Sequence, residues 1–172
     1  MLIDLTGIIK NESGKLMISE SFDMPEISFM GEEFDFSEPF CAEGVIVNNS
    51  KSLELDMTVT GKATVHCARC GKPILADISF PVRETLVREG DEVPTDEDVI
   101  LYSGKEIELD SVIVSSFLMN VPIKYLCKDD CMGLCPRCGT NLNEHTCDCG
   151  KDDIDPRWEK LAEIMKNMTD TK

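Results

Sequence analysis

Residues 52–67 read SLELDMTVTGKATVHC, and this stretch decides the fold class because apolar and polar residues alternate along its whole length. A period of two is typical of a β-strand with one buried and one exposed face. Gly61 lies in the middle of the stretch and predicts a bulge or bend, so the residues form one curved strand or two shorter ones. Either arrangement leads directly into Cys67.

Shorter stretches with the same alternation occur on both sides, separated by Asn, Ser, Gly and Pro. They cover residues 2–9, 16–22, 40–47 and 76–86. Pro81 in the last of them has no backbone N–H to donate, which places it at a sheet edge or a bulge. The pattern predicts an antiparallel sheet, or a partly closed barrel, through about residue 90.

Two helices are predicted after these strands. Asp110 can cap the first, which ends at Asn120 and Pro122. Its apolar residues cover most of its circumference, so this helix should be largely buried. The second runs from about 156 to 168, with Pro156 in its first turn. We therefore expect an α+β chain with a β-rich main domain at 1–126 and a cysteine-rich module with a terminal helix at 127–172.

The chain is strongly acidic, with 17 Lys and Arg against 33 Asp and Glu and a formal charge of -16. This charge disfavours nonspecific attraction to nucleic acid or anionic membranes and suits a basic partner. Contact with nucleic acid would need a local basic patch or a cationic protein as intermediary. Six acids between Glu89 and Asp98 predict an exposed loop, with a docking site for a basic partner as the alternative.

No export signal is visible at the start of the chain, and no apolar run approaches the roughly 20 residues that cross a bilayer. These features predict a cytoplasmic protein without membrane association. In a reducing cytoplasm, nine cysteines indicate metal or redox chemistry more often than disulfides.

Eight of the nine cysteines fall into close pairs, and close pairs let one turn present two thiolates to one tetrahedral ion. The pairs are Cys67 with Cys70, Cys127 with Cys131, Cys135 with Cys138, and Cys147 with Cys149. Two sites of four sulfurs would use all eight, which predicts two structural zinc ions. Cys41, between Phe40 and Ala42, is expected to be a buried small residue.

The segment 135–139, CPRCG, has the form of a zinc knuckle, in which Gly139 lets the backbone turn beneath the metal. Its natural partner is the pair Cys147 and Cys149, eight residues further on. Residues 67–71, CARCG, have the same form, and with Cys127 and Cys131 they would connect the main domain to the zinc-stabilised module. In the competing arrangement, Cys127 and Cys131 join Cys135 and Cys138, and the pair at 67 and 70 stays a dithiol. The first arrangement is favoured because it leaves no ligand pair idle.

Other chemistry fits these residues less well. A redox dithiol at Cys67 and Cys70 would normally precede a helix in a βαβ unit, and iron–sulfur ligation remains an alternative to zinc. A catalytic zinc keeps an open position, which four sulfurs would fill. His66 and His145 are expected at the surface, and no phosphate loop or nucleophile motif is present, so no enzymatic activity is predicted.

Basic residues lie beside or between the proposed ligands and can offset the negative charge that four thiolates leave around zinc. With one more lysine nearby, they form the candidate basic contact patch: Arg69, Lys72, Lys124, Lys128 and Arg137.

Three segments together resemble the YceD family: the residues CARC at 67–70, CKDDCMGLCPRCGTNLNEHTCDCG at 127–150, and DPR at 155–157. This family is associated in bacteria and plastids with accumulation of large-subunit ribosomal RNA, and its gene commonly neighbours that of a small zinc-binding ribosomal protein. The resemblance implies a ribosome-biogenesis factor whose partner is large-subunit precursor RNA, a pre-ribosomal particle or a basic ribosomal protein. The competing functions are a thiol redox protein that uses Cys67 and Cys70, and a zinc-stabilised acidic adaptor for a basic protein.

Overall fold

The computed structural model describes residues 1–92 and 99–149, together with 158, 160 and 164. The chain divides into two compact units, one formed by Met1–Ala68 with Lys72–Cys127 and the other by Arg69–Gly71 with Lys128–Lys172. Residues 93–98 of the acidic stretch, the DPR segment, and nearly all of the helix predicted at 156–168 lie outside the described residues.

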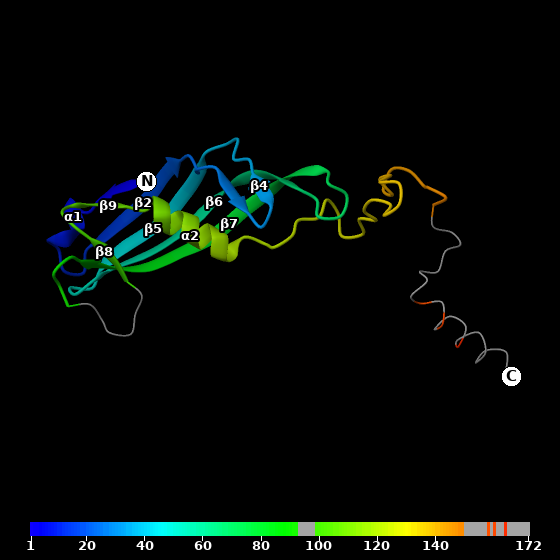
Figure 1. The fold of residues 1–172 in the computed structure, drawn as a ribbon. Coiled ribbons are helices and arrows are strands. Elements are labelled where there is room, and N and C mark those ends of the chain that lie inside the picture. The colour runs from blue at the N-terminus through cyan, green and yellow to red at the C-terminus, as the bar shows by residue number, and fades with distance from the viewer. Residues whose placement is uncertain (93–98, 150–157, 159, 161–163, 165–172) are drawn as a thin grey trace. The chain divides into compact units, whose positions relative to one another are not determined.

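The first unit is built on a five-stranded sheet with the strand order β2-β5-β6-β7-β8 (Figure 1). The strands are β2 (Lys15–Phe22), β5 (Phe40–Asn48), β6 (Leu53–His66), β7 (Pro73–Arg88) and β8 (Val99–Tyr102). Neighbouring strands are antiparallel except β7 and β8, which are parallel. The sheet is therefore mixed, and within the described residues it is open and does not close into a barrel.

Short elements complete this unit. They are β1 (Leu2–Asp4) paired with β9 (Glu106–Glu108), the hairpin of β3 (Ile27–Phe29) and β4 (Glu32–Phe34), and the helices α1 (Thr6–Ile9) and α2 (Asp110–Asn120). The expectation of one strand over residues 2–9 is wrong in its second half. The side chain of Asp4 accepts the N–H of Thr6 at 2.8 Å, a local turn that ends the strand and starts α1.

The alternation at 52–67 does form one continuous strand. Its partner residues on β7 run without interruption from Leu86 opposite Leu53 to Pro73 opposite His66, so Gly61 makes no bulge. A Cβ at Gly61 would lie 2.5 Å from the ring of Phe40, which is fully buried. Glycine is needed at this position because an aromatic ring packs directly on the backbone of the neighbouring strand.

Pro81 lies on a part of β7 with one neighbouring strand among the described residues. It is paired with Thr58 of β6, whereas β8 pairs only with Thr85–Arg88 of β7. This placement agrees with the edge position expected from the missing N–H of proline.

Helix α2 lies along the sheet (Figure 1) and is anchored by the fully buried Phe117. The Phe117 ring packs edge-on against Phe34, Phe36 and Phe80, with centroid distances of 5.1, 5.7 and 5.8 Å. Met119 on the same helix is 80% exposed. We expected most of the circumference of this helix to be buried, but only one face is. Its buried residues are Val112, Ile113, Ser116 and Phe117.

Cys41 is exposed, which corrects the expectation of a buried residue. It lies on β5 between Phe40 and Ala42, which are both fully buried. Because successive side chains of a strand point to opposite faces, two buried neighbours place Cys41 on the outer face. The small size and apolar character of cysteine had suggested burial, but its position in the alternation decides the outcome.

Residues 69–71 and 128–149 of the second unit form no helix or strand. Turns hold it together: the N–H of Cys135 donates to the carbonyl of Thr140 at 2.8 Å, and the N–H of Leu142 donates to that of Gly133 at 2.9 Å. Met132 and Leu134 are 61% and 45% exposed. With little apolar surface buried, a segment of this size needs another source of stability.

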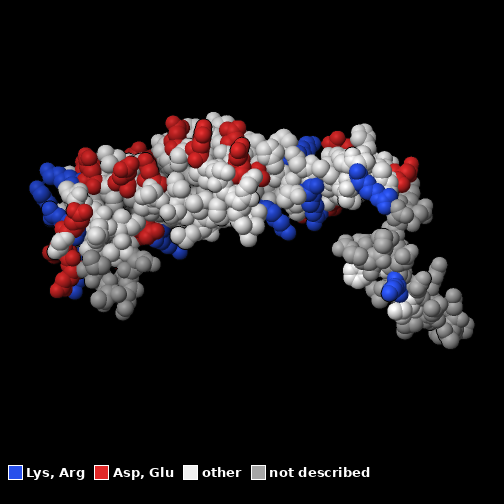
Figure 2. Space-filling model, in the orientation of Figure 1, with Lys and Arg blue, Asp and Glu red and all other residues white. Residues whose placement is uncertain are grey.

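The two units differ sharply in charge. In the sequence, the first unit carries 23 Asp and Glu against 9 Lys and Arg, and the second carries 10 against 8. Figure 2 shows acidic side chains over the visible face of the first unit. The acidity of the chain therefore belongs mainly to the β-rich unit.

Candidate metal centre

The eight paired cysteines lie in two groups of four. In each group the sulfur atoms are all within 4.8 Å of one another. A tetrahedral zinc ion with bonds of about 2.3 Å to sulfur separates its ligands by about 3.8 Å, so the spacing suits one metal ion per group. The first group is Cys67, Cys70, Cys127 and Cys131, and the second is Cys135, Cys138, Cys147 and Cys149.

The first group is the more buried of the two. Cys67, Cys70 and Cys131 are only 2%, 8% and 3% exposed. The N–H of Cys67 donates to the carbonyl of Lys72 at 2.9 Å and so closes the turn that carries Cys67 and Cys70. Gly71 has φ +68°, a conformation that glycine adopts without a steric penalty. The predicted role of glycine after the knuckle therefore has a conformational basis.

The second group is more open to solvent. Cys135 is buried but Cys138 is exposed, and Cys147 and Cys149 are half-buried. Gly139 has φ +72°, and its N–H donates to the carbonyl of Cys135 at 2.9 Å. The N–H of Cys135 donates to the carbonyl of Thr140 at 2.8 Å, as that of Cys67 does to Lys72, so the second knuckle repeats the turn of the first and is more exposed.

The pKa values of two thiols in the second group are shifted in opposite directions. The hydroxyl of Thr140, 3.1 Å from the sulfur of Cys138, lowers the pKa of Cys138 to about 6, with help from the Thr140 main chain and Cys135. The hydrogen bond of Cys149 with Cys138, and the charge on that sulfur, raise the pKa of Cys149 to about 11. Crowded thiolates thus disfavour each other, and a bound cation would relieve this repulsion.

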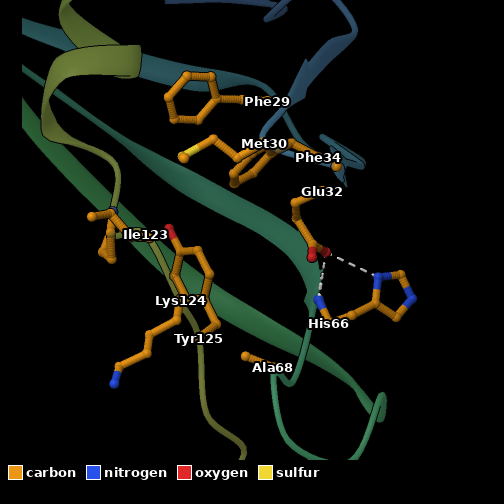
Figure 3. A pocket seen from close by; sticks show the side chains of 11 residues that line it. Phe29, Met30, Glu32, Phe34, His66, Ala68, Ile123, Lys124 and Tyr125 are labelled. Atoms are coloured by element: carbon orange, nitrogen blue, oxygen red, sulfur yellow. Dashed lines mark hydrogen bonds and ion pairs between the residues drawn. The ribbon is translucent and has the colours of Figure 1, made fainter.

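His66 directly precedes Cys67 but belongs to neither group, and it lines a hollow of the first unit beside the β3–β4 hairpin (Figure 3). Its N–H and its ring Nδ1 lie 2.7 and 3.0 Å from one carboxylate oxygen of Glu32. Lys124 and Tyr125 line the same hollow. Burial raises the pKa of Tyr125, whose hydroxyl has no hydrogen-bond partner among the described residues. Neither His66 nor the exposed His145 belongs to a sulfur group, as expected for surface residues.

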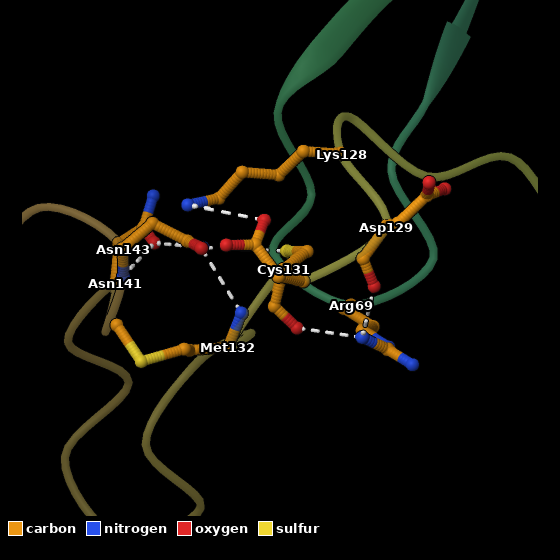
Figure 4. Close-up of polar contacts among 8 residues, drawn as sticks. Arg69, Lys128, Asp129, Cys131, Met132, Asn141 and Asn143 are labelled. Carbon is orange, nitrogen blue, oxygen red and sulfur yellow. Dashed lines mark hydrogen bonds and ion pairs between the residues drawn. The ribbon is translucent and has the colours of Figure 1, made fainter.

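Two predicted basic residues are engaged within the second unit (Figure 4). Arg69 donates to the carbonyls of Cys131 and Asp129 at 2.8 and 3.3 Å, and Lys128 pairs with Asp130 at 3.6 Å. Lys124 lines the hollow described above, and Lys72 and Arg137 are exposed. A shared contact patch of these five residues stays a prediction.

The sequence did not single out the polar residues that contact the sulfurs. Thr140 contacts Cys138, and the side-chain amide of Asn143 donates to the sulfur of Cys131 at 3.3 Å (Figure 4). Both lie in the connection between the two ligand pairs of the second group. The sequence could have pointed to them, because metal ligands are usually supported by neighbouring hydrogen-bonding groups and these hydroxyl and amide residues lie between two ligand pairs.

A family model described as "Large ribosomal RNA subunit accumulation protein YceD" matches residues 55–165, which include every cysteine of both groups. The chain belongs to the YceD family. This family is described by its role in ribosomal RNA accumulation and not by a chemical reaction.

The chain is also similar to proteins from bacteria and from a plant. The uncharacterized protein Rv2926c of Mycobacterium tuberculosis is 28% identical over 142 residues, which cover 81% of this chain and 64% of that protein. The chloroplastic large ribosomal RNA subunit accumulation protein YCED homolog 1 of Arabidopsis thaliana is 26% identical, covering 72% of this chain and 47% of its own length. The uncharacterized protein YlbN of Bacillus subtilis is 20% identical, covering 86% of both chains. The chain thus spans less than two thirds of the mycobacterial relative.

No solved structure matches the chain. Among the described residues, no helix has the length and apolar character needed to span a membrane.

Proposed function

We propose that this YceD family member is a non-enzymatic ribosome-biogenesis factor that supports accumulation of large-subunit ribosomal RNA in the cytoplasm, and that two zinc ions stabilise its cysteine-rich segment. The family match over residues 55–165 is the observation that carries the ribosomal role. The name of the Arabidopsis relative describes the same role in a plastid.

The two sulfur groups support the proposal of structural zinc. All-thiolate sites with four ligands are typical of structural zinc, because no coordination position is left for substrate. The described part of the second unit buries few apolar side chains, so metal binding would supply stability that packing does not. With Cys127 and Cys131 close to them, Cys67 and Cys70 fit a ligand set better than an isolated redox dithiol.

Charge supports a basic partner for the first unit. Between Lys15 and Lys51 the sequence has no Lys or Arg but eight Asp and Glu, and all of these acids except Glu32 are exposed. Such a surface repels the phosphate backbone and attracts cationic proteins. We infer that the protein reaches the pre-ribosomal particle through a basic ribosomal protein, with the less acidic second unit as the candidate for RNA contact.

Depletion of the protein tests the ribosomal role. The ratio of large- to small-subunit ribosomal RNA should fall in depleted cells and recover when the wild-type gene is restored. An unchanged ratio would rule out the proposed role. Copurification of a basic ribosomal protein that is lost at high salt would support the partner, whereas copurification of ribosomal RNA at high salt with no basic ribosomal protein present would refute it.

A further inference from the structure

The side chain of Asn143 connects the two sulfur groups through residues that all belong to the second unit. Asn143 lies in the connection between Cys138 and Cys147, the two ligand pairs of the second group, yet its Nδ2 contacts the sulfur of Cys131 in the first group at 3.3 Å. A residue fixed by one group therefore touches a ligand of the other (Figure 4).

The orientation of this amide follows from its partners. Oδ1 of Asn143 accepts the main-chain N–H of Met132 at 2.9 Å, and that N–H can only donate. The opposite end, Nδ2, must then face the sulfur of Cys131 and the Oδ1 of Asn141, which lies 2.9 Å away. Both amide protons and the carbonyl are engaged, so the side chain has a single favourable position.

A donor in this position favours metal at the first group. Four thiolates around a divalent cation leave a net negative charge, which an N–H directed at one sulfur stabilises. Loss of such a supporting contact typically lowers metal affinity about 10- to 100-fold. Cys131 is almost fully buried, so solvent has little access to replace the lost donor.

The position of Asn143 in turn depends on the second group. Its connection begins and ends at ligands of that group and is held to the chain before it by the N–H of Leu142, which donates to the carbonyl of Gly133 at 2.9 Å. Metal in the second group would fix both ends of the connection. Without that metal, the conformational entropy lost when Asn143 is ordered lowers the metal affinity of the first group.

We propose that Asn143 couples the two groups, so that metal in the second raises the affinity of the first. Reciprocity of binding free energies requires the first metal to favour the second equally. Asn143 acts as a positioning residue and not as a ligand. This inference rests on the proposed zinc binding.

Zinc titration of the metal-free full chain, followed by native mass spectrometry, tests the coupling without any variant. At half saturation, two independent and equal sites would leave about half of the molecules with one ion, and coupling leaves clearly fewer. A one-ion fraction of half or more, together with a zinc affinity of the first group that stays the same when Cys149→Ser disables the second group, would overturn the coupling. Binding of fewer than two ions at saturation would instead refute the proposed zinc function.

A double-mutant cycle assigns the coupling to Asn143. Asn143→Asp keeps the acceptor for Met132 but puts a carboxylate oxygen in place of the donor that faces Cys131, and Cys149→Ser disables the second group. Zinc affinity of the first group, measured by competition with a chromophoric chelator, should fall about 10- to 100-fold in N143D. It should also fall in C149S, and the double variant should lose less than the product of the two changes. Fully multiplicative losses, or an effect of the exposed neighbour control Glu144→Gln equal to that of N143D, would contradict the assignment.

Discussion

Replacement of Gly133 by alanine should damage the first sulfur group through the main chain. Gly133 has φ +74°, and a Cβ there would lie 3.0 Å from the carbonyl oxygen of Arg69. The same carbonyl accepts the N–H of Leu134 at 3.2 Å, so it cannot move away without loss of that bond. Arg69 lies between Cys67 and Cys70, and its displacement would disturb the spacing of these two ligands.

Gly139→Ala is the matched control, because Gly139 has nearly the same φ, +72°, but a Cβ there would meet nothing within 4 Å. Both substitutions place alanine in the left-handed region, at a cost of about 1–2 kcal/mol. They also reduce the freedom of the unfolded chain equally. Only Gly133→Ala adds crowding, worth about 1–3 kcal/mol, so this difference isolates the contact with Arg69.

Equilibrium competition with a chelator measures the result. A difference of about 1–3 kcal/mol corresponds to about 5- to 150-fold weaker zinc retention in G133A than in G139A. Thermal unfolding of the zinc-loaded proteins should rank the variants in the same order. Equal retention by the two variants would show that the close approach to Arg69 has no part in holding the first group.

Three further results are expected. Phe117→Ala should lower the free energy of unfolding in urea by about 3–5 kcal/mol, because it removes a fully buried ring. Met119→Ala on the exposed face should change it by less than about 0.5 kcal/mol. Similar losses in the two variants would show that Phe117 does not anchor the helix on the sheet. Calorimetry in buffers of different ionisation enthalpy should show fewer than four protons released when zinc fills the second group at pH 7. Cys138, with a pKa of about 6, is already mostly thiolate at this pH, while Cys149, with a pKa of about 11, must lose its proton. Release of four protons would contradict this expectation. Thiol titration of the zinc-loaded protein should detect one fast-reacting cysteine, the exposed Cys41, and none in Cys41→Ser; additional fast thiols would show that the ligands are not all bound.

Much of the sheet could be predicted because alternation reports burial directly. Residues 52–67 form the predicted strand because one face is buried along its whole length. The parallel pairing of β7 with β8 was not predicted, because register between distant strands depends on tertiary packing that alternation does not encode. The same limit applies to Gly61, which the sequence marks as unusual without identifying Phe40 as the reason.

The cysteine pairs could be recognised from spacing, because two thiolates on one turn must lie close together. Which pairs meet depends on the return of the chain, so the grouping of Cys67 and Cys70 with Cys127 and Cys131 was one of two arrangements until the fold was known. Asn143 was missed since its contact with Cys131 depends on how the connection folds back, and an asparagine in a loop has many ordinary roles.

X-ray absorption at the zinc edge, on protein purified without added metal, tests the central claim most directly. Two zinc ions per chain, each with a shell of four sulfurs at about 2.3 Å, are the expected result. Nitrogen or oxygen in the first shell, one zinc per chain, or iron in place of zinc would contradict the assignment of both sulfur groups as structural zinc sites.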